Sequence, residues 1–359
     1  MNAEFGRLLI QWYAIHAREM PWRGTSDPYA IWVSEIMLQQ TQVNTVIPYY
    51  NNWMRKFPTV QKLAQAGEHE VLNAWEGLGY YSRARNMIKA AHLICEKYNG
   101  RFPTTAAELR QLPGIGRYTA AAISSIAFGA DEAVLDGNVK RVLARVFEFS
   151  KEVNTPDGEK ELWVLAAELL PKGEASAYNQ AVMDLGATIC SPKSPGCMNC
   201  PVNTLCASYA NRRQDQFPVI REKQPIPHID VVAAIIRQNG LVLIARRPSK
   251  GLLGGLWEFP GGKLETDENH TEALIREIRE ELGVNVLPIE KFGVYKHAYT
   301  HFKVTLQAWF ADLQGQQPVA LEASEIRWVK IEELTDYPMG KIDRLISNDL
   351  LKTIKSFST

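Results

Sequence analysis

The most constraining feature of this sequence is a group of four cysteines within seventeen residues, Cys190, Cys197, Cys200 and Cys206. Their spacing, C-x6-C-x2-C-x5-C, allows four thiolates to converge on one metal centre. Disulfides are disfavoured because nothing in the sequence indicates secretion, and cytosolic thiols stay reduced. Structural zinc usually takes two C-x2-C pairs, whereas this stretch has one. A four-cysteine iron–sulfur cluster fits at least as well, so both metal centres remain open.

The chain changes texture about two thirds of the way along. A length of 359 residues suggests two domains rather than one core. Residues 1–211 read as helices separated by short Gly/Pro stretches, and Arg212–His228 reads as a linker with three prolines and mixed charge. Residues 229–359 contain β-branched apolar runs, a hairpin signal at Asn239-Gly240 and one charged helix. We therefore expect an all-α domain (1–211), a linker (212–228) and an α+β domain (229–359).

Overall charge gives no argument for a nucleic-acid partner. The net charge is zero, and residues 1–211 hold 20 Lys+Arg and 20 Asp+Glu, which leaves 20 of each for the remainder. Any contact with phosphates must come from helix N-termini or from single cations. The candidate cations are Arg83, Arg85, Arg117, Lys140 and Arg141.

The sequence predicts a cytoplasmic protein. No apolar run approaches the ~20 residues that a membrane span needs. The early charges of the N-terminus argue against a signal peptide. We therefore expect a reducing compartment and no membrane partner.

A glycine-rich turn precedes an alanine-rich helix. Gly114 and Gly116, in L-P-G-I-G, let the backbone turn sharply and approach a ligand closely. The helix expected to follow, over 117–128, would direct its free N–H groups at an anion such as a phosphate. An ordinary corner between two helices explains the same residues equally well.

Two carboxyl groups have contrasting sequence environments. Glu35 lies in an apolar helical stretch, PYAIWVSEIMLQQTQ, which would raise its pKa and let it carry a proton at neutral pH. Asp136, in VLDGNVKRV, opens a helix, where the helix dipole would keep it ionised. One protonated and one ionised carboxyl is the pair that breaks glycosidic bonds. A solvated helix Glu and a plain N-cap are the structural alternatives.

Amide and aromatic side chains occur at the polar ends of two apolar helices. One group is Gln39, Gln40 and Thr41, and the other includes Leu78 and Tyr80 in G-L-G-Y-Y. Side chains of these kinds fill the gap left when a base is extruded from a duplex. Taken singly, each stretch is also explained by capping or packing.

The ordered set of motifs resembles the helix–hairpin–helix DNA glycosylases with a [4Fe–4S] cluster, the endonuclease III superfamily, and within it the MutY family of adenine DNA glycosylases. The set comprises L-P-G-I-G-R-Y-T-A, L-D-G-N-V and the four cysteines, and the resemblance covers about the whole chain. It implies a [4Fe–4S] cluster on Cys190, Cys197, Cys200 and Cys206, held at the end of the helical domain. Tyr118 stands where strand-cutting relatives carry the Schiff-base lysine, so the resemblance implies a glycosylase without a lysine lyase step.

The resemblance also implies roles for individual residues. Glu35 would protonate adenine at N7, Asp136 would stabilise the sugar cation, and Asn138 and Tyr118 would position these groups. Further roles would fall to Trp22, Arg23, Leu38 and Gln180 in the base pocket, to Gln39, Gln40, Thr41, Leu78 and Tyr80 at the opened duplex, and to Gly114 and Gly116 at a phosphate.

The C-terminal part contains a complete Nudix signature. It runs Gly262-x5-Glu268-x7-Arg276-Glu277-Ile278-x-Glu280-Glu281-x-Gly283-Val284. Glu277, Glu280 and Glu281 share one helix face and would hold Mg²⁺ if this box is active. The family's C-terminal domain resembles the Nudix fold but typically has a degraded box and reads 8-oxoguanine. The intact box makes nucleotide pyrophosphohydrolysis an alternative or additional activity.

Tyr299, Thr300 and His301 stand where the family carries the Phe-Ser-His loop that touches 8-oxoguanine. We therefore expect an adenine DNA glycosylase that acts, as a nucleoid-associated monomer, on double-stranded DNA with adenine opposite 8-oxoguanine or guanine and leaves an abasic site. A DNA-binding module without catalysis is the third alternative, and Glu35 and Asp136 argue against it.

Overall fold

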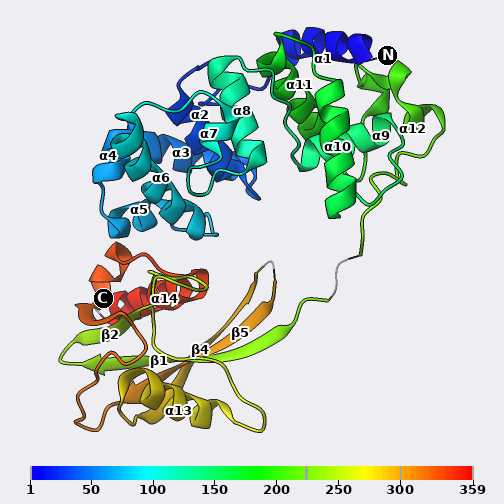
Figure 1. Ribbon diagram of the computed structural model, residues 1–359. Helices are drawn as coiled ribbons and strands as arrows, with labels where there is room; N and C mark the ends of the chain where they lie inside the picture. The colour runs from blue at the N-terminus through cyan, green and yellow to red at the C-terminus, as the bar shows by residue number, and fades with distance from the viewer. Residues whose placement is uncertain (1, 223–224, 300, 358–359) are drawn as a thin grey trace. The chain divides into compact units, whose positions relative to one another are not determined.

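The computed structural model describes residues 2–222, 225–299 and 301–357 (Figure 1). Its contacts group the chain into two compact units. The helical unit comprises residues 1–65 and 86–223, and the sheet unit comprises residues 66–85 and 224–359. This division differs from the predicted boundaries at two places, because residues 66–85 group with the C-terminal part and most of the predicted linker groups with the helices.

Helices account for the regular structure before the linker. They are α1 (Asn2–His16), α2 (Pro28–Leu38), α3 (Val43–Lys56), α4 (Val60–Gln65), α5 (Glu68–Trp75), α6 (Ser82–Tyr98), α7 (Ala106–Leu109), α8 (Arg117–Phe128), α9 (Gly137–Val146), α10 (Pro156–Glu168), α11 (Ala175–Thr188) and α12 (Ala207–Ala210). Local sequence sets several ends. Asp27 caps α2 by accepting the N–H of Tyr29, with Pro28 as the first helical residue, and Gly129 ends α8 in the left-handed conformation.

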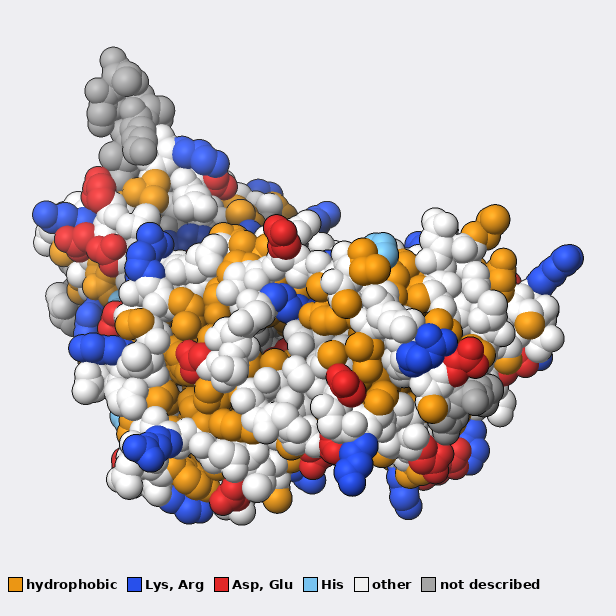
Figure 2. Space-filling view, turned by 90° about the horizontal axis from the view of Figure 1, so that it is seen from above, with side chains coloured by type: hydrophobic (Ala, Val, Ile, Leu, Met, Phe, Trp, Pro, Cys, Tyr) orange, Lys and Arg blue, Asp and Glu red, His pale blue; other side chains and the backbone are white. Residues whose placement is uncertain are grey.

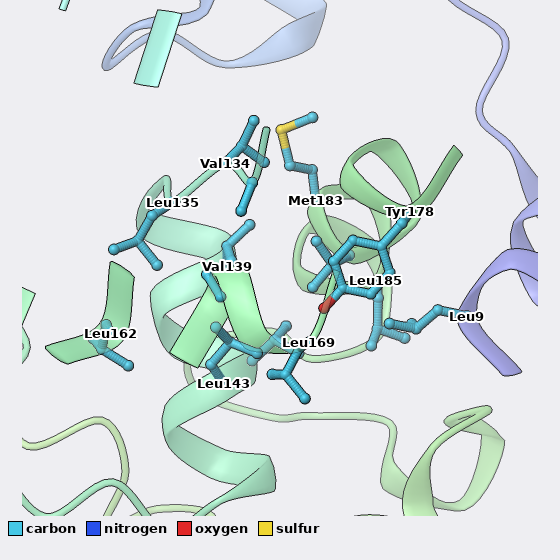
Figure 3. Packing of buried hydrophobic residues seen from close by; sticks show 14 of the residues in the cluster. Leu9, Val134, Leu135, Val139, Leu143, Leu162, Leu169, Tyr178, Met183 and Leu185 are labelled. Carbon is cyan, nitrogen blue, oxygen red and sulfur yellow. The ribbon is translucent and has the colours of Figure 1, made fainter. Parts of the chain in front are cut away.

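One hydrophobic core of the helical unit is built largely from α1, α9, α10 and α11 (Figure 3). Its labelled side chains are Leu9, Val134, Leu135, Val139, Leu143, Leu162, Leu169, Tyr178, Met183 and Leu185. The buried polar residue Asn179, on α11, joins other segments of the helical unit by hydrogen bonds. Its amide donates to the Glu132 carbonyl (2.8 Å) and the Ser125 hydroxyl (3.0 Å) and accepts the Val134 N–H (3.3 Å). The strand-like segment that leads into α9 is thereby fixed against α11.

Much of the predicted linker is anchored to the helical unit. The guanidinium of Arg145, on α9, is almost fully buried and donates to the carbonyls of Gln214 and Phe217 (3.0 Å each). Further along, the Val153 N–H donates to Val219 O at 2.9 Å. These bonds hold the first part of the predicted linker against the helical unit, which its composition does not predict.

The sheet unit contains strands β1 (His228–Gln238), β2 (Leu241–Arg246), β3 (Trp257–Glu258), β4 (Leu287–Ala298), β5 (Lys303–Asp312) and β6 (Glu325–Lys330). Their order is β3-β2-β1-β5-β4, with β6 also paired to β2. The β1–β5 pair is parallel, and β1 and β2 form the predicted hairpin through Asn239 and Gly240, both at positive φ.

Helices cover both faces of this sheet (Figure 1). Ala233 and Ile235 of β1 pack in one core with α14 (Lys341–Phe357), while Val232, Ala234 and Ile236 pack in another with α13 (His270–Leu282). The α13 N-terminus has the Asn269–Glu272 capping box. The helix α14 is a feature that our reading of the sequence missed.

Charged side chains of both signs are interspersed on the face drawn in Figure 2, as the zero net charge suggests. Within the described ranges, no helix is long and apolar enough to span a membrane.

Replacement of Asn179 by Ala should lower the free energy of unfolding of the helical unit by about 3 kcal/mol, because the buried Val134 N–H loses its acceptor and the part-buried Glu132 carbonyl loses its donor. Urea titration followed by circular dichroism measures this. The exposed Asn211→Ala is the matched control and should shift the midpoint little. Equal effects of the two substitutions would contradict the role given to Asn179.

Candidate functional site

A cavity of about 1000 Å³ in the helical unit brings the predicted active-site residues together. Its lining includes all the predicted catalytic and base-pocket residues, together with the group of predicted duplex contacts at 39–41. These are Trp22, Arg23, Glu35, Leu38, Gln39, Gln40, Thr41, Tyr118, Asp136, Asn138 and Gln180. The lining comes from α2 and the segments on either side of it, and from α8, α9 and α11, so segments more than 100 residues apart meet there.

Glu35 lies on α2 with its side chain almost fully buried. The hydroxyl of Tyr118, at the start of α8, donates to Glu35 Oε2 at 2.6 Å and lies 3.3 Å from Met183 Sδ. Burial raises the pKa of Glu35, and the Tyr118 hydrogen bond and the Arg23 charge act in the opposite direction. A carboxyl in this setting can carry a proton into the cavity.

Asp136 is the N-cap of α9, as expected. Its Oδ1 accepts the Val139 N–H at 2.7 Å, and its Oδ2 accepts the Asn138 amide at 3.0 Å. We expected the helix N-terminus to keep this carboxyl ionised, but burial raises the pKa of Asp136 above its ordinary value. The two hydrogen bonds and the Arg141 charge oppose that rise. These lowering influences favour the ionised form of Asp136 relative to a carboxyl buried without partners.

Asn138 is held from its other side by Arg141. The Arg141 guanidinium donates to Asn138 Oδ1 (2.8 Å), to Gly186 O (2.7 Å) and to Cys190 O (2.8 Å). Gly186 permits this packing, because a Cβ there would lie 2.6 Å from Asn138 Cβ. The donors of Arg141 are thus engaged within the protein, and its contact with a phosphate stays a prediction.

The predicted base pocket rests on a carboxylate that our reading of the sequence missed. Asp184, fully buried on α11, accepts from Arg23 Nη2 at 2.8 Å and from Arg18 at 2.6 and 3.0 Å. Gln180, one helical turn earlier, accepts from Arg23 and donates to Ser176 O at 3.1 Å. An acid four residues after Gln180 on an apolar helix was the available signal, because such a group needs a cationic partner.

The predicted duplex-wedge residues occupy unusual backbone conformations. Gln40 follows α2 with φ of +56°, and its neighbour Gln39 donates its amide to Thr119 Oγ1 at 3.3 Å. In the sheet unit, Tyr80 has φ of +48° and its side chain is 38% exposed, while Leu78 is buried. Left-handed backbone at a non-glycine residue costs free energy and persists only when neighbours hold it.

The glycine-rich turn has the predicted form. Gly114 has φ of +78°, and a Cβ there would lie 2.7 Å from Asn86 Cβ, so glycine is needed for two reasons. Gly116 is the N-cap residue of α8, with open space where a Cβ would stand. The free N–H groups of α8 are thus available for an anion at this end.

The four clustered cysteines line a second, small cavity in the helical unit. Cys190, Cys197, Cys200 and Cys206 are free thiols there, together with apolar side chains such as Val142. Burial raises the pKa of Cys200 to about 12, so its thiolate would need a bound cation to form at neutral pH. The donor set of four thiols around one apolar cavity fits an iron–sulfur cluster.

The Nudix signature covers the loop before α13, the helix itself and the C-cap residue Gly283 in the sheet unit. Arg276 donates to both oxygens of Glu268 (2.9 and 2.8 Å), to Glu277 (3.0 Å) and to Glu280 (3.2 Å). Glu281 accepts the Gly261 N–H at 2.9 Å, and burial raises its pKa to about 7. Across the residues that the structure describes, no three His, Cys, Asp or Glu side chains are placed to hold a single metal ion.

The predicted 8-oxoguanine loop joins β4 to β5. Tyr299 packs edge-to-face on His297, with ring centroids 4.5 Å apart, and its N–H donates to Phe302 O at 2.9 Å. His301 is exposed, and Thr300 lies outside the described residues.

Comparison with known proteins agrees with this arrangement. Residues 33–168 match the family model described as HhH-GPD superfamily base excision DNA repair protein, and residues 231–348 match that of the NUDIX domain. Curated relatives named adenine DNA glycosylase include the rat protein, 38% identical over 92% of this chain and 74% of its own length. The human protein is 37% identical over 90% of this chain and 70% of its own length.

Solved structures resemble the helical part of the chain. A thermostable thymine-DNA glycosylase is 32% identical, with a TM-score of 0.54, over 58% of this chain and 97% of that one. A non-covalent endonuclease III–DNA complex is 25% identical, with a TM-score of 0.50, over 59% of this chain and 98% of that one. The predicted fold class, a helix–hairpin–helix glycosylase domain followed by a Nudix-like domain, is thereby confirmed, and the chain belongs to the adenine DNA glycosylase family.

Proposed function

We propose that this protein removes adenine from double-stranded DNA where adenine stands opposite 8-oxoguanine or guanine, leaving an abasic site. The observation that carries the proposal is the meeting of Glu35, Tyr118, Asp136 and Asn138 around one cavity large enough for a nucleotide. The name shared by the curated relatives supplies the base, and the resemblance to the MutY family supplies the mispair.

The two carboxyls divide the chemistry. Glu35, kept protonated by burial, donates its proton to N7 of adenine, so that the electrons of the breaking C–N bond move onto a neutral leaving base. The sugar becomes an oxocarbenium-like cation, which the Asp136 carboxylate stabilises until water adds to the anomeric carbon. Asn138 fixes one Asp136 oxygen and is itself fixed by Arg141.

Tyr118 limits the reaction to hydrolysis. A phenol cannot form a Schiff base with the opened sugar, and the Tyr118 hydroxyl is already hydrogen-bonded to Glu35. We therefore assign the protein no lysine lyase step at this position.

Arg23 and Gln180 define one edge of the base pocket. Both ends of the Gln180 amide are engaged, at Arg23 and at Ser176, so its orientation is set before a base arrives. Asp184 forms ion pairs with both Arg18 and Arg23. Trp22 and Leu38, in the same lining, supply apolar surface for the base.

Cys190, Cys197, Cys200 and Cys206 would hold a [4Fe–4S] cluster. When bound, such a cluster cross-links the chain after α11 through four iron–sulfur bonds, and we give it no part in breaking the glycosidic bond. We place Lys193, in the loop between the first two thiols, on the side of DNA.

We assign recognition of 8-oxoguanine to the sheet unit through Tyr299, Thr300 and His301. Nucleotide pyrophosphohydrolysis is not favoured as a second activity. Arg276 already pairs with Glu277 and Glu280, and Glu281 is turned to the Gly261 N–H.

Replacement of Asp136 by Asn should slow single-turnover adenine release from a duplex with adenine opposite 8-oxoguanine by at least ~100-fold, because the cation loses its counter-charge. The exposed Asp157→Asn is the matched control and should keep the wild-type rate. Failure of the wild-type protein to release adenine, or an unchanged rate in Asp136→Asn, would contradict the proposed function.

Replacement of Tyr118 by Phe should shift the pH profile of adenine release. Glu35 acts in its protonated form, so the rate falls as the pH rises through its pKa. The Tyr118 hydrogen bond stabilises the carboxylate and lowers that pKa, so its loss raises the pKa. The alkaline limb of the single-turnover rate should therefore move to higher pH. A limb that stays in place or moves to lower pH would argue against Glu35 as the proton donor.

Protein purified without exposure to oxygen should contain about four iron and four sulfide per chain. Cys200→Ser should lose iron and the visible absorbance of the cluster, whereas Cys95→Ser, at the fifth cysteine, should retain both. Stoichiometric zinc in place of iron in the wild-type protein would overturn the assignment.

A further inference from the structure

The turn between α5 and α6 has a strained backbone. Gly77 (φ +99°), Gly79 (φ +71°) and Tyr80 (φ +48°) are all left-handed. Glycine adopts this conformation freely, but tyrosine does so at a cost in free energy that its surroundings must offset. Tyr80 is nevertheless exposed, whereas its neighbours Leu78 and Tyr81 are both buried.

Two side chains hold the carbonyls of this turn. Trp75 Nε1, at the end of α5, donates to Gly79 O at 3.0 Å. Arg83 Nη2, in the first turn of α6, donates to both Leu78 O and Gly79 O at 3.1 Å. Because these carbonyls flank the left-handed residues, the bonds fix the backbone on which the Tyr80 side chain is mounted.

The guanidinium of Arg83 also contacts the aromatic rings. Its Cζ lies 5.2 Å from the centroid of Trp75 and 5.5 Å from the centroid of Tyr80, distances at which a cation is attracted to a ring. Burial lowers the pKa of Arg83 to about 10, and the group remains charged at neutral pH. One side chain thus joins the turn backbone, the buried Trp75 and the exposed Tyr80.

We infer that Arg83 is a positioning residue that holds Tyr80 ready to enter the opened duplex, and that it does not serve as a phosphate contact. The inference rests on the proposed function, in which Tyr80 fills the space beside the displaced base. It revises the prediction that Arg83 is a local cation for DNA, because its carbonyl and ring partners lie within the turn.

A pre-formed turn explains why the strain is retained. If the turn were loose, DNA binding would have to order it, and that loss of conformational entropy would weaken lesion binding. A ring already held in place contributes its stacking on neighbouring bases without that cost.

The test compares full-length wild type with Arg83→Met, Tyr80→Ala and the double variant. The dissociation constant is measured at several salt concentrations. The duplex carries a non-cleavable analogue of the adenine nucleotide opposite 8-oxoguanine. Fluorescence of a 2-aminopurine placed beside the mispair reports base unstacking. We expect Arg83→Met and Tyr80→Ala each to weaken lesion binding about tenfold and to reduce unstacking alike. The double variant should be no weaker than Tyr80→Ala alone.

Salt dependence separates positioning from phosphate binding. Loss of one phosphate contact reduces the slope of log K against log salt by about 0.9, whereas loss of a positioning residue leaves the slope unchanged. Arg83→Lys keeps the charge and lacks the planar fork that reaches two carbonyls, so it should resemble Arg83→Met. The exposed Arg55→Met serves as the matched control and should bind as wild type does.

Three outcomes would overturn the inference: a reduced salt slope in Arg83→Met, independent and additive effects of the two single substitutions, or full rescue by Lys. Affinity for undamaged duplex checks that Arg83→Met is folded, and Arg83→Lys carries the same comparison with Tyr80→Ala if it is not. Absence of adenine release by the wild-type protein would instead sink the proposed function, since binding and unstacking are measured without turnover.

Discussion

The helix α9 is the element on which the site depends, because its N-cap and its successive turns bind different parts of the helical unit. Asp136 caps its N-terminus and faces the cavity, Arg141 binds the carbonyls of Gly186 and Cys190, and Arg145 binds the carbonyls of the segment after α12. All of these bonds are made by one rigid helix and its N-cap. A displacement of the cysteine loop would therefore be transmitted through α9 to the Asp136 carboxyl at its N-terminus. The position of the Asp136 carboxyl therefore depends on how firmly α9 holds the cysteine loop and the segment after α12.

Within the cavity, the two carboxyls differ in the hydrogen bonds that they receive. Both have raised pKa values with burial as the largest cause. Asp136 accepts a helix N–H and an amide and lies near Arg141, whereas Glu35 accepts one phenol hydroxyl. The donors that distinguish the acid from the counter-charge thus come from α8 and α9.

Sequence reasoning succeeded where the signal is local or has fixed spacing. The helix over 117–128, the Asn239-Gly240 hairpin and the N-cap at Asp136 follow from periodicity, turn chemistry and capping. The grouping of distant residues around one cavity came from the resemblance, since single motifs left ordinary structural explanations open.

Other features could not be read from the sequence for physical reasons. Asp184 pairs with Arg18 across 166 positions, and charge partners at such separation leave no local pattern. Arg145 binds carbonyls of a segment whose prolines and charges resemble a free linker. The helix α14 was missed although Ile342, Ile346 and Leu350 repeat every four residues, a stripe that buries them against the sheet. The carbonyl partners of Arg83 and Arg141 also leave no local pattern, because the fold decides which groups surround a cation.

The even mixture of charges has a consequence for how such an enzyme would search a genome. Binding to undamaged DNA is mainly electrostatic, and a protein that neutralises few phosphates leaves the duplex quickly. Basic and acidic side chains are interspersed, and several arginines are engaged within the protein. The protein would therefore slide only a short distance along DNA before it dissociates. Such a protein would sample DNA by many brief landings, and pre-shaped elements such as the Tyr80 turn would have to test each site within one landing.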